Sequence, residues 1–234
     1  MYRSIFRVAA ITCLIALGLS RSASAAPITI DSFETPASPL LFIGPSGPPA
    51  GADSGAGVLG TRTLSSSTTL GLGDVVAIGN GTFQVFTGTT SMESVLTYNG
   101  AGFPLDFSAD LGIVFDFLFL DGGISNTTTD FEVTLNTSTG PLTGSVTVSD
   151  TAVPFSALLL FASFSGPGNL ATVNSIVFGF NNGGSPQQGA DFVLDELSVA
   201  AALVPEPASL ALCGVAGMAA LWSGRRRVRK SRRK

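Results

Sequence analysis

Apolar and polar residues alternate along several stretches in the middle of the chain. The alternation is clearest in LGIVFDFLFL (111–120), FEVTLNT (131–137), LTGSVTV (142–148) and NSIVFGF (174–180). A repeat of two residues indicates a β-strand with one buried face. Weaker patterns of the same kind predict further strands at 28–33, 74–79, 82–86, 93–98, 157–164 and 191–199.

Turn-forming residues separate these predicted strands, as in GNG (79–81), DGG (121–123) and NNGG (181–184). No apolar repeat of helical period runs between the two ends of the chain. The pattern therefore predicts an all-β domain over residues 26–203, a two-sheet antiparallel sandwich of jelly-roll-like type. The stretch GPSGPPAGADSGAG (44–57) is predicted to be a long surface loop. Most of the domain's sixteen Phe residues fall on the apolar phase, which favours packing between sheets over an aromatic binding stripe.

The opening MYRSIFRVAAITCLIALGLSRSASAAP has the layout of a secretory signal peptide. Two arginines precede an apolar stretch at 8–19, and Ala23 and Ala25 supply small residues at the cleavage site. This predicts a signal helix over residues 1–25, removed by signal peptidase after Ala25. The protein is therefore expected to be exported.

The other end, VPEPASLALCGVAGMAALWSGRRRVRKSRRK (204–234), has three parts. Pro205 and Pro207 precede an apolar run at 208–223, and eight basic residues follow. As a helix of about 1.5 Å per residue, sixteen residues span roughly 24 Å, less than a hydrocarbon core of about 30 Å. The basic residues hold their side of the membrane in the cytoplasm, and those nearest the run are Arg225, Arg226, Arg227 and Arg229. Such a segment suits a temporary stop-transfer helix over 208–224, although a permanent single-pass anchor is also open.

This three-part tail resembles the PEP-CTERM sorting signal of Gram-negative bacteria. The resemblance covers about the last thirty residues, with the motif at Val204, Pro205, Glu206 and Pro207 and the basic tail at 225–234. It implies recognition by a membrane-embedded exosortase that cuts near the motif. The chain would pass through the inner membrane transiently and then reach the cell surface or an extracellular polysaccharide matrix.

The charge of the domain is strongly one-sided. Between residues 26 and 203, Arg62 is the single basic residue against fifteen Asp and Glu, which gives a net charge of −14. The whole-chain value of −4 conceals this, because the other basic residues lie in the two end segments. Nucleic acid is therefore excluded as a partner, and an acidic polysaccharide would need a bridging cation.

Several kinds of catalysis are excluded by composition. The chain has no histidine, and both cysteines, Cys13 and Cys213, lie in the end segments. Triads that use histidine, thiolate nucleophiles and histidine zinc sites are therefore absent from the domain. A pair of acids for glycoside hydrolysis stays open, since the domain has four glutamates, Glu34, Glu93, Glu132 and Glu196. Nothing in their spacing brings two of them together, so we expect no enzyme activity.

The two ends of the domain carry a second resemblance. In ADFVLDELSVA (190–200) the apolar phase slips at Asp195-Glu196, which predicts a β-bulge. With ITIDSFE (28–34), this closing strand resembles those of carbohydrate-binding-module and galactose-binding-like jelly rolls. The resemblance implies neighbouring first and last strands and a structural Ca²⁺, held by Glu34 and Asp195 and less strongly by Asp31 and Glu196. Against sugar binding, the domain has no Trp and one Tyr, Tyr98.

Together these features predict an exported, exosortase-processed β-sandwich of the cell surface or matrix, with a structural or adhesive, non-catalytic role. A glycan-binding module is the alternative, and a glycan-cleaving enzyme with two carboxylates is a weaker one.

Overall fold

The computed structural model describes residues 27–34, 40–45, 47, 49–54, 57–66, 70–88, 90–123, 127–181 and 188–202. Ala26–Ala201 form one compact unit. The predicted signal helix at 1–25 and the predicted sorting segment at 204–234 lie outside the described residues, so both stay predictions. Within the described ranges no helix is long and apolar enough to cross a membrane.

The described part of the chain is built from strands and two short 3-10 helices. The first strands are β1 (Ile28–Asp31), β2 (Leu40–Ile43), β3 (Ala50–Asp53), β4 (Thr61–Ser66), β5 (Val75–Gly79), β6 (Thr82–Phe86) and β7 (Ser94–Asn99). The longer strands follow as β8 (Asp110–Asp121), β9 (Thr128–Thr137), β10 (Gly140–Ser149), β11 (Phe155–Leu160), β12 (Val173–Phe180) and β13 (Asp191–Ala201). The helices η1 (Phe161–Ser163) and η2 (Leu170–Thr172) lie between β11 and β12.

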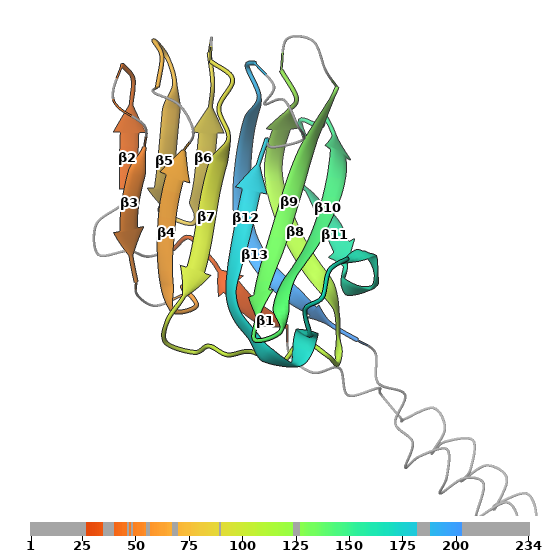
Figure 1. Ribbon diagram of the computed structural model, residues 1–234. Helices are drawn as coiled ribbons and strands as arrows, with labels where there is room; N and C mark the ends of the chain where they lie inside the picture. The colour runs from red at the N-terminus through yellow and green to blue at the C-terminus, as the bar shows by residue number, and fades with distance from the viewer. Residues whose placement is uncertain are drawn as a thin grey trace, which may run out of the picture. The chain divides into compact units, whose positions relative to one another are not determined.

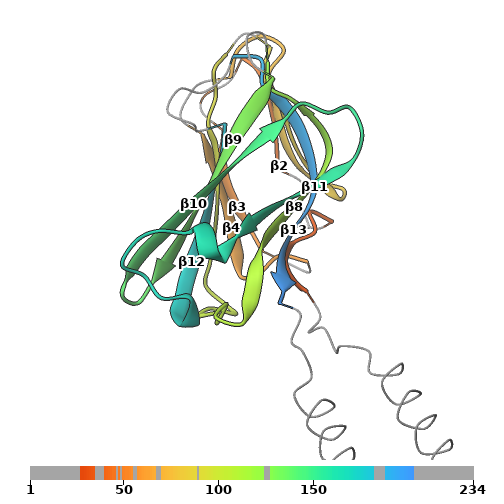
Figure 2. The ribbon, with the colours of Figure 1, turned by 90° about the vertical axis from the view of Figure 1, so that its right-hand side faces the viewer.

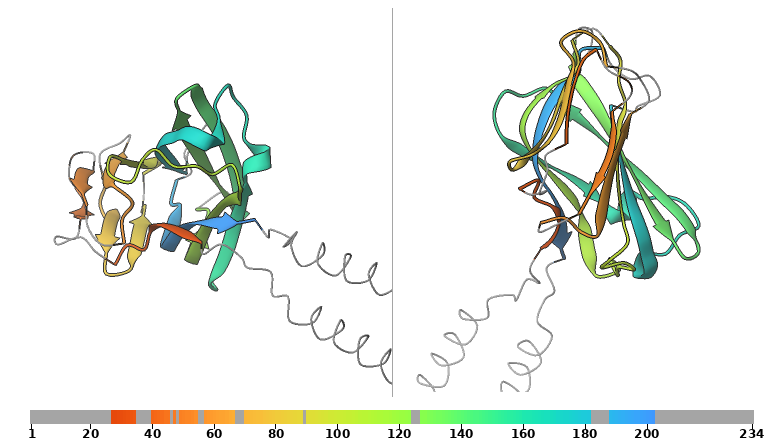
Figure 3. Two further views of the ribbon diagram at one scale, coloured as in Figure 1. Left: turned by 90° about the horizontal axis from the view of Figure 1, so that it is seen from below. Right: turned by 90° about the vertical axis from the view of Figure 1, so that its left-hand side faces the viewer.

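These strands form two antiparallel sheets packed face to face (Figures 1 and 2). One sheet has seven strands in the order β11-β8-β13-β6-β5-β2, with β1 paired to β13. The other has six, in the order β10-β9-β12-β7-β4-β3. The prediction of an all-β, two-sheet antiparallel sandwich is thus confirmed. Figure 3 shows the first strand, β1, alongside the last, β13, as their pairing requires.

Aromatic rings fill the space between the sheets. Phe83 and Phe192 come from the seven-stranded sheet, and Phe131 and Phe180 come from the six-stranded sheet. All four are at most 1 % exposed, and their ring centroids lie 5.2 to 5.9 Å apart in the pairs that touch. Contacts of this length are favourable edge-to-face or offset arrangements. The prediction that phenylalanine packs the core is confirmed for these residues.

The prediction of one long loop at 44–57 is wrong, because β3 lies inside it and pairs with β4. The strands β2 and β4 were also missed. β3 is an edge strand of small residues, AGAD, whose composition does not indicate a strand. It is held in the sheet by its hydrogen bonds to β4. Gly51 faces Leu40, and a Cβ there would lie 2.9 Å from the leucine side chain. A side chain at position 51 would therefore have to displace the end of the Leu40 side chain.

A buried ion pair joins the two sheets. Arg62 of β4 is 0 % exposed, and its Nη1 lies 2.6 Å from Oδ2 of Asp31 in β1. The hydroxyl of Tyr98 in β7 donates to the same oxygen at 2.7 Å. The other carboxylate oxygen accepts the backbone N–H of Phe33 at 2.8 Å. One carboxylate of the seven-stranded sheet thus holds two residues of the six-stranded sheet.

The backbone next to this ion pair has an unusual conformation. Phe33 has a φ of 53°, a left-handed conformation that is rare for a bulky residue, and its ring lies under the Arg62 guanidinium at 5.7 Å. Burial raises the pKa of Asp31, while Arg62 and the hydrogen bonds oppose that rise. A charge so far from water depends on its partner, since leaving it unpaired is far more costly than removing both charges.

We therefore expect Arg62→Met to lower the free energy of unfolding of the full chain by about 3–5 kcal/mol, measured by urea unfolding. Adding Asp31→Asn should recover most of this loss, because no charge is then buried. The matched control is Glu132→Gln on a partly exposed position of β9, with a change of less than about 0.5 kcal/mol. An unchanged stability of Arg62→Met would contradict the structural importance of the pair.

Candidate functional site

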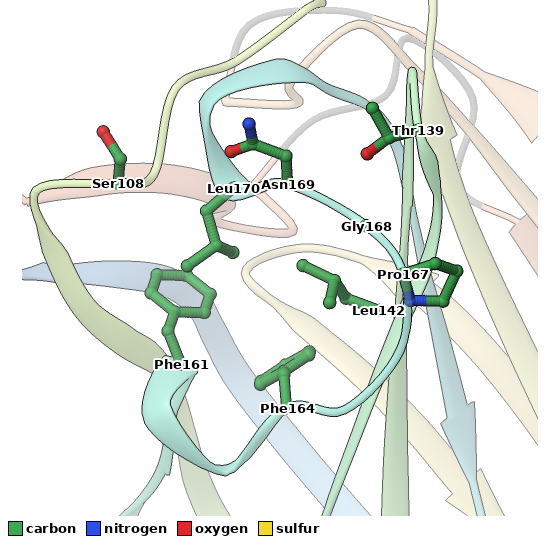
Figure 4. Close-up of a pocket in the computed structure, with 9 residues that line it drawn as sticks. All are labelled: Ser108, Thr139, Leu142, Phe161, Phe164, Pro167, Gly168, Asn169 and Leu170. Carbon is green, nitrogen blue, oxygen red and sulfur yellow. The ribbon is translucent and has the colours of Figure 1, made fainter.

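A hollow of about 620 Å³ opens beside the start of β10, where the segment with η1 and η2 passes (Figure 4). It is lined by Ser108, Thr139, Leu142, Phe161, Phe164, Pro167, Gly168, Asn169 and Leu170. The segment is tied to β10 by a pair of backbone hydrogen bonds between Thr143 and Ser165, at 2.8 and 2.9 Å. The segment that forms a wall of the hollow is therefore held to the sheet by backbone hydrogen bonds.

The floor of the hollow is apolar. Phe161 stacks on Phe107 with centroids 5.4 Å apart and also meets Phe164, at a centroid distance of 5.6 Å. Phe164 lies against Gly144 of β10, where a Cβ would come within 2.8 Å of the ring. Glycine at this position therefore lets the ring lie against the strand. Phe161 is 6 % exposed, whereas Phe164 is only half-buried and can offer part of its ring to a ligand.

The rim of the hollow carries polar side chains. Asn169 accepts the backbone N–H of Ala171 at 2.9 Å and so caps η2, which fixes its amide at the opening. The hydroxyl of Ser108 donates to Asp106 at 2.6 Å, and the hydroxyls of Thr139 and Thr137 lie 3.2 Å apart. An apolar floor with a few fixed hydrogen-bonding groups around it is the usual build of a small-molecule site.

Two carboxylates lie near this rim without lining the hollow. Hydrogen bonds from the hydroxyl and amide of Ser108 hold the pKa of the exposed Asp106 below its usual value. Burial, and then the charge of Asp106, raise the pKa of Asp110. None of the nine lining residues has a carboxyl, thiol, amine or imidazole group. The hollow can therefore hold a neutral molecule, but its own lining offers no acid–base pair.

The structure places the four predicted calcium ligands differently from one another. Asp31 points into the core and is paired with Arg62, so it has another partner. Glu196 accepts a hydrogen bond from Thr29 at 3.1 Å, and Glu34 and Asp195 are exposed. The register of β13 shifts between Leu194 and Glu196, which is the bulge predicted from the phase slip.

The four residues do not converge on one point. Within the described ranges no group of three or more acidic, His or Cys side chains is placed to hold a metal ion. Calcium binding by Glu34 and Asp195 stays a prediction. It depends on Asn, backbone or water oxygens to complete the six to eight ligands that calcium takes.

Acidic residues gather at the end of the sandwich where β13 begins. Asp191 pairs with Asp121 across β13 and β8, and its carboxylate accepts the Thr87 amide at 2.7 Å. Asp74 is fully buried and accepts hydrogen bonds from Gly71, Gly88 and Thr90. Burial raises the pKa of Asp191, and the charges of Asp121 and Asp74 raise it further against the effect of the amide.

The hollow does not follow from the sequence, because the pattern at 157–164 predicts one continuous strand. In the structure β11 ends at Leu160, and η1 begins at Phe161 and turns the chain away. The signal present in the sequence is SGPG at 165–168, a break of glycine and proline directly after Phe164.

Comparison with known proteins adds little about identity. No protein-family model matches the chain, and no curated protein matches it. Among solved structures, the family 11 carbohydrate-binding module of a Clostridium thermocellum cellulase is similar at 18 % identity and a TM-score of 0.43, covering 79 % of this chain and 99 % of that one. A carbohydrate-binding module specific for non-crystalline cellulose has 10 % identity and a TM-score of 0.36, covering 59 % and 77 %.

An agarase gives 8 % identity and a TM-score of 0.43, covering 80 % of this chain and 26 % of that enzyme. The neighbours thus include carbohydrate-binding modules with a β-sandwich fold. Values this low support no argument about what this chain binds.

The acidic end leads to a prediction on pH. Because the pKa of folded Asp191 is raised, the folded state loses stability as pH rises from the unfolded pKa through the folded one. Asp191→Asn keeps an oxygen for the Thr87 amide and removes the charge. We expect it to raise the melting temperature at pH 7 by about one or two degrees and to have no effect near pH 3.

Melting followed by circular dichroism checks this, with Glu132→Gln as the control on a partly exposed position of β9. A gain that persists at pH 3 would contradict the electrostatic explanation.

Proposed function

We propose that the sandwich is a non-catalytic glycan-binding domain, and that the hollow beside β10 is its binding site. The supporting observation is the combination of the partly exposed Phe164 ring on the floor with the Asn169 amide and the Thr139 hydroxyl on the rim. A sugar has apolar C–H faces and hydroxyl edges, so it can use both kinds of surface at once.

Charge limits the class of glycan. Arg62, the single basic residue between positions 26 and 203, is fully buried against Asp31, so it is not available to a ligand. The exposed acidic residues of the domain therefore have no basic side chain of the domain to offset their charge. An acidic polysaccharide would be repelled. The proposed ligand is therefore a neutral glycan.

The lining of the hollow supports binding without cleavage. Glycoside hydrolysis in most families needs two carboxyl groups on either side of the scissile bond. The nine lining residues include none. The role we propose is adhesive: the domain attaches the protein to neutral polysaccharide outside the cell.

We propose the cell surface or extracellular matrix of a Gram-negative bacterium as its destination, reached through signal peptidase and exosortase. The support is the order of the tail, with Pro-Glu-Pro at 205–207, an apolar run, and eight basic residues at the end. The domain itself keeps a single basic residue, so nearly all positive charge lies in the segments that this processing would remove.

Processing predicts a particular mass. The natural protein recovered from the surface or culture medium should begin near residue 26 and end near Pro205–Pro207, which intact mass spectrometry measures. A membrane form that retains Lys234 would make the tail a permanent anchor and would exclude exosortase cleavage.

If the domain binds a neutral glycan, the protein should migrate more slowly in gels that contain neutral polysaccharide. The full chain in mild detergent should be slowed by at least one of mixed-linkage β-1,3-1,4-glucan, hydroxyethylcellulose and agarose, and not by alginate, an acidic polymer. Phe164→Ala should weaken the affinity up to about tenfold, since an aromatic contact is worth roughly 0.5–1.5 kcal/mol and about 1.4 kcal/mol is a factor of ten.

The matched control is Phe155→Ala, which removes another partly buried ring, stacked on Phe117, outside the hollow. If the chain migrates freely in all three neutral gels, the proposed function is wrong. If both variants weaken binding equally, the hollow is not the site.

A further inference from the structure

The strand β2 forms an open edge of the seven-stranded sheet (Figure 1). It pairs with β5 on one side, and no described strand pairs with its other side. Its sequence is LLFI, in which Leu41 and Ile43 are 58 % and 59 % exposed, whereas Leu40 and Phe42 pack against the core. Unpaired backbone groups beside exposed apolar side chains favour pairing with a further strand.

The direction of the free backbone groups follows from one hydrogen bond. The N–H of Gly44 donates at 3.0 Å to the carbonyl oxygen of Asp74, the residue next in register on the β5 side. The backbone groups of successive residues in an antiparallel strand face its two sides alternately. Phe42 therefore faces β5 as Gly44 does, whereas the N–H and C=O groups of Leu41 and Ile43 face the open edge.

These groups are complementary to those of a second copy of the same strand. An antiparallel pairing about a two-fold axis at Phe42 places Leu41 opposite Ile43 of the second copy, and Ile43 opposite its Leu41. Residues in such pairs exchange both of their backbone hydrogen bonds. The outward side chains of the two copies then lie next to each other as cross-strand apolar pairs. The same patch serves both copies, as a closed two-fold contact requires.

Charge also favours this edge for a contact between copies. Each domain has a net charge of −14 between residues 26 and 203, so two copies repel each other wherever acidic surfaces meet. The sequence between Glu34 and Asp53 contains no charged residue. The next strands of the sheet, VVAIG in β5 and TFQVF in β6, contain none either. Two copies can therefore pair through β2 without bringing carboxylates of these strands together.

The strands β3, β10 and β11 at the other edges suit such a contact less well. On β10, Thr143 is already bonded through the backbone to Ser165. β3 has the sequence AGAD and offers no large apolar side chain. On β11, Ser156 donates to the carboxylate of Asp116, which is partly exposed on the neighbouring β8. Two copies that met at β11 would therefore bring like charges near each other.

We infer that β2 is a dimerisation edge, at which two copies of this chain pair antiparallel and join their seven-stranded sheets. Pro39 and Pro45 border the strand in the sequence and have no N–H, which confines the pairing to the four residues of β2. A contact this short makes a weak, concentration-dependent dimer.

The dimer leaves the hollow open. The hollow lies beside β10, and β10 and β2 are at opposite ends of the two sheets (Figure 1). Combined with the proposed function, a dimer carries two glycan sites, which raises the avidity for a polymer that can reach both.

Sedimentation equilibrium of the full chain in a density-matched mild detergent tests the dimer between about 1 μM and about 1 mM. The protein mass of the wild type should rise from 23.8 kDa toward twice that value as the concentration increases. Leu41→Glu should weaken association more than tenfold, because a carboxylate of each copy would then lie against an apolar side chain of the other. Ile43→Pro should do the same, since it removes an N–H of the open edge and none that faces β5.

The matched control is Leu158→Glu, the same change at an exposed position of β11 on the opposite edge of the sheet, and it should leave association unchanged. Melting followed by circular dichroism shows whether each variant is folded, and Leu41→Glu decides alone if the proline variant unfolds. A wild type that stays monomeric throughout overturns the inference. So does association that folded Leu41→Glu leaves intact, or that Leu158→Glu weakens equally. None of these outcomes depends on glycan binding, so the proposed function is tested separately.

Discussion

The buried contact between Arg62 and Asp31 is the interaction on which the rest of this sandwich depends. Asp31 belongs to the seven-stranded sheet, and Arg62 and Tyr98 belong to the six-stranded sheet. An ion pair away from water gives little net stability compared with apolar packing, but it strongly disfavours arrangements in which either charge is left alone. It therefore fixes how β1 lies against β13 and how the two sheets face each other at that end. The left-handed backbone of Phe33 is held by the same carboxylate.

The pair also decides the electrostatics of the surface. A domain with one basic residue would ordinarily show that charge to solvent, because arginine is rarely fully buried. Here the Arg62 charge is buried against Asp31, so the exposed acidic side chains have no basic side chain of the domain to neutralise them. Mutual repulsion near Asp191 and the exclusion of acidic polymers follow from this single placement. The hollow beside β10 has a neutral lining, and it is the neutrality of that lining that directs the proposed function toward uncharged glycans.

The outer faces of the two sheets carry different kinds of side chain. On β4 and β10 the outward positions are mostly threonine and serine, whereas β9 also turns Asp130 and Glu132 outward. On β2, β8 and β11 several outward positions are leucine or isoleucine. The acids that make the domain negative lie largely in turns and at strand ends.

The sequence by itself determined the class of the fold, since the alternation in 111–120 and 131–137 leaves only strands with one buried face, and β8 and β9 lie there. It also determined the bulge in β13, because the apolar phase slips visibly at Asp195-Glu196. It did not reveal β3, whose small residues carry no pattern and which exists through its pairing with β4. Only the tertiary structure decided that Arg62 and Asp31 meet and that Phe161 and Phe164 leave a hollow beside Gly144. The physical reason is the same in each case: period along a strand is a local property, whereas contact between strands far apart in the chain is set by register and by the packing of the two sheets.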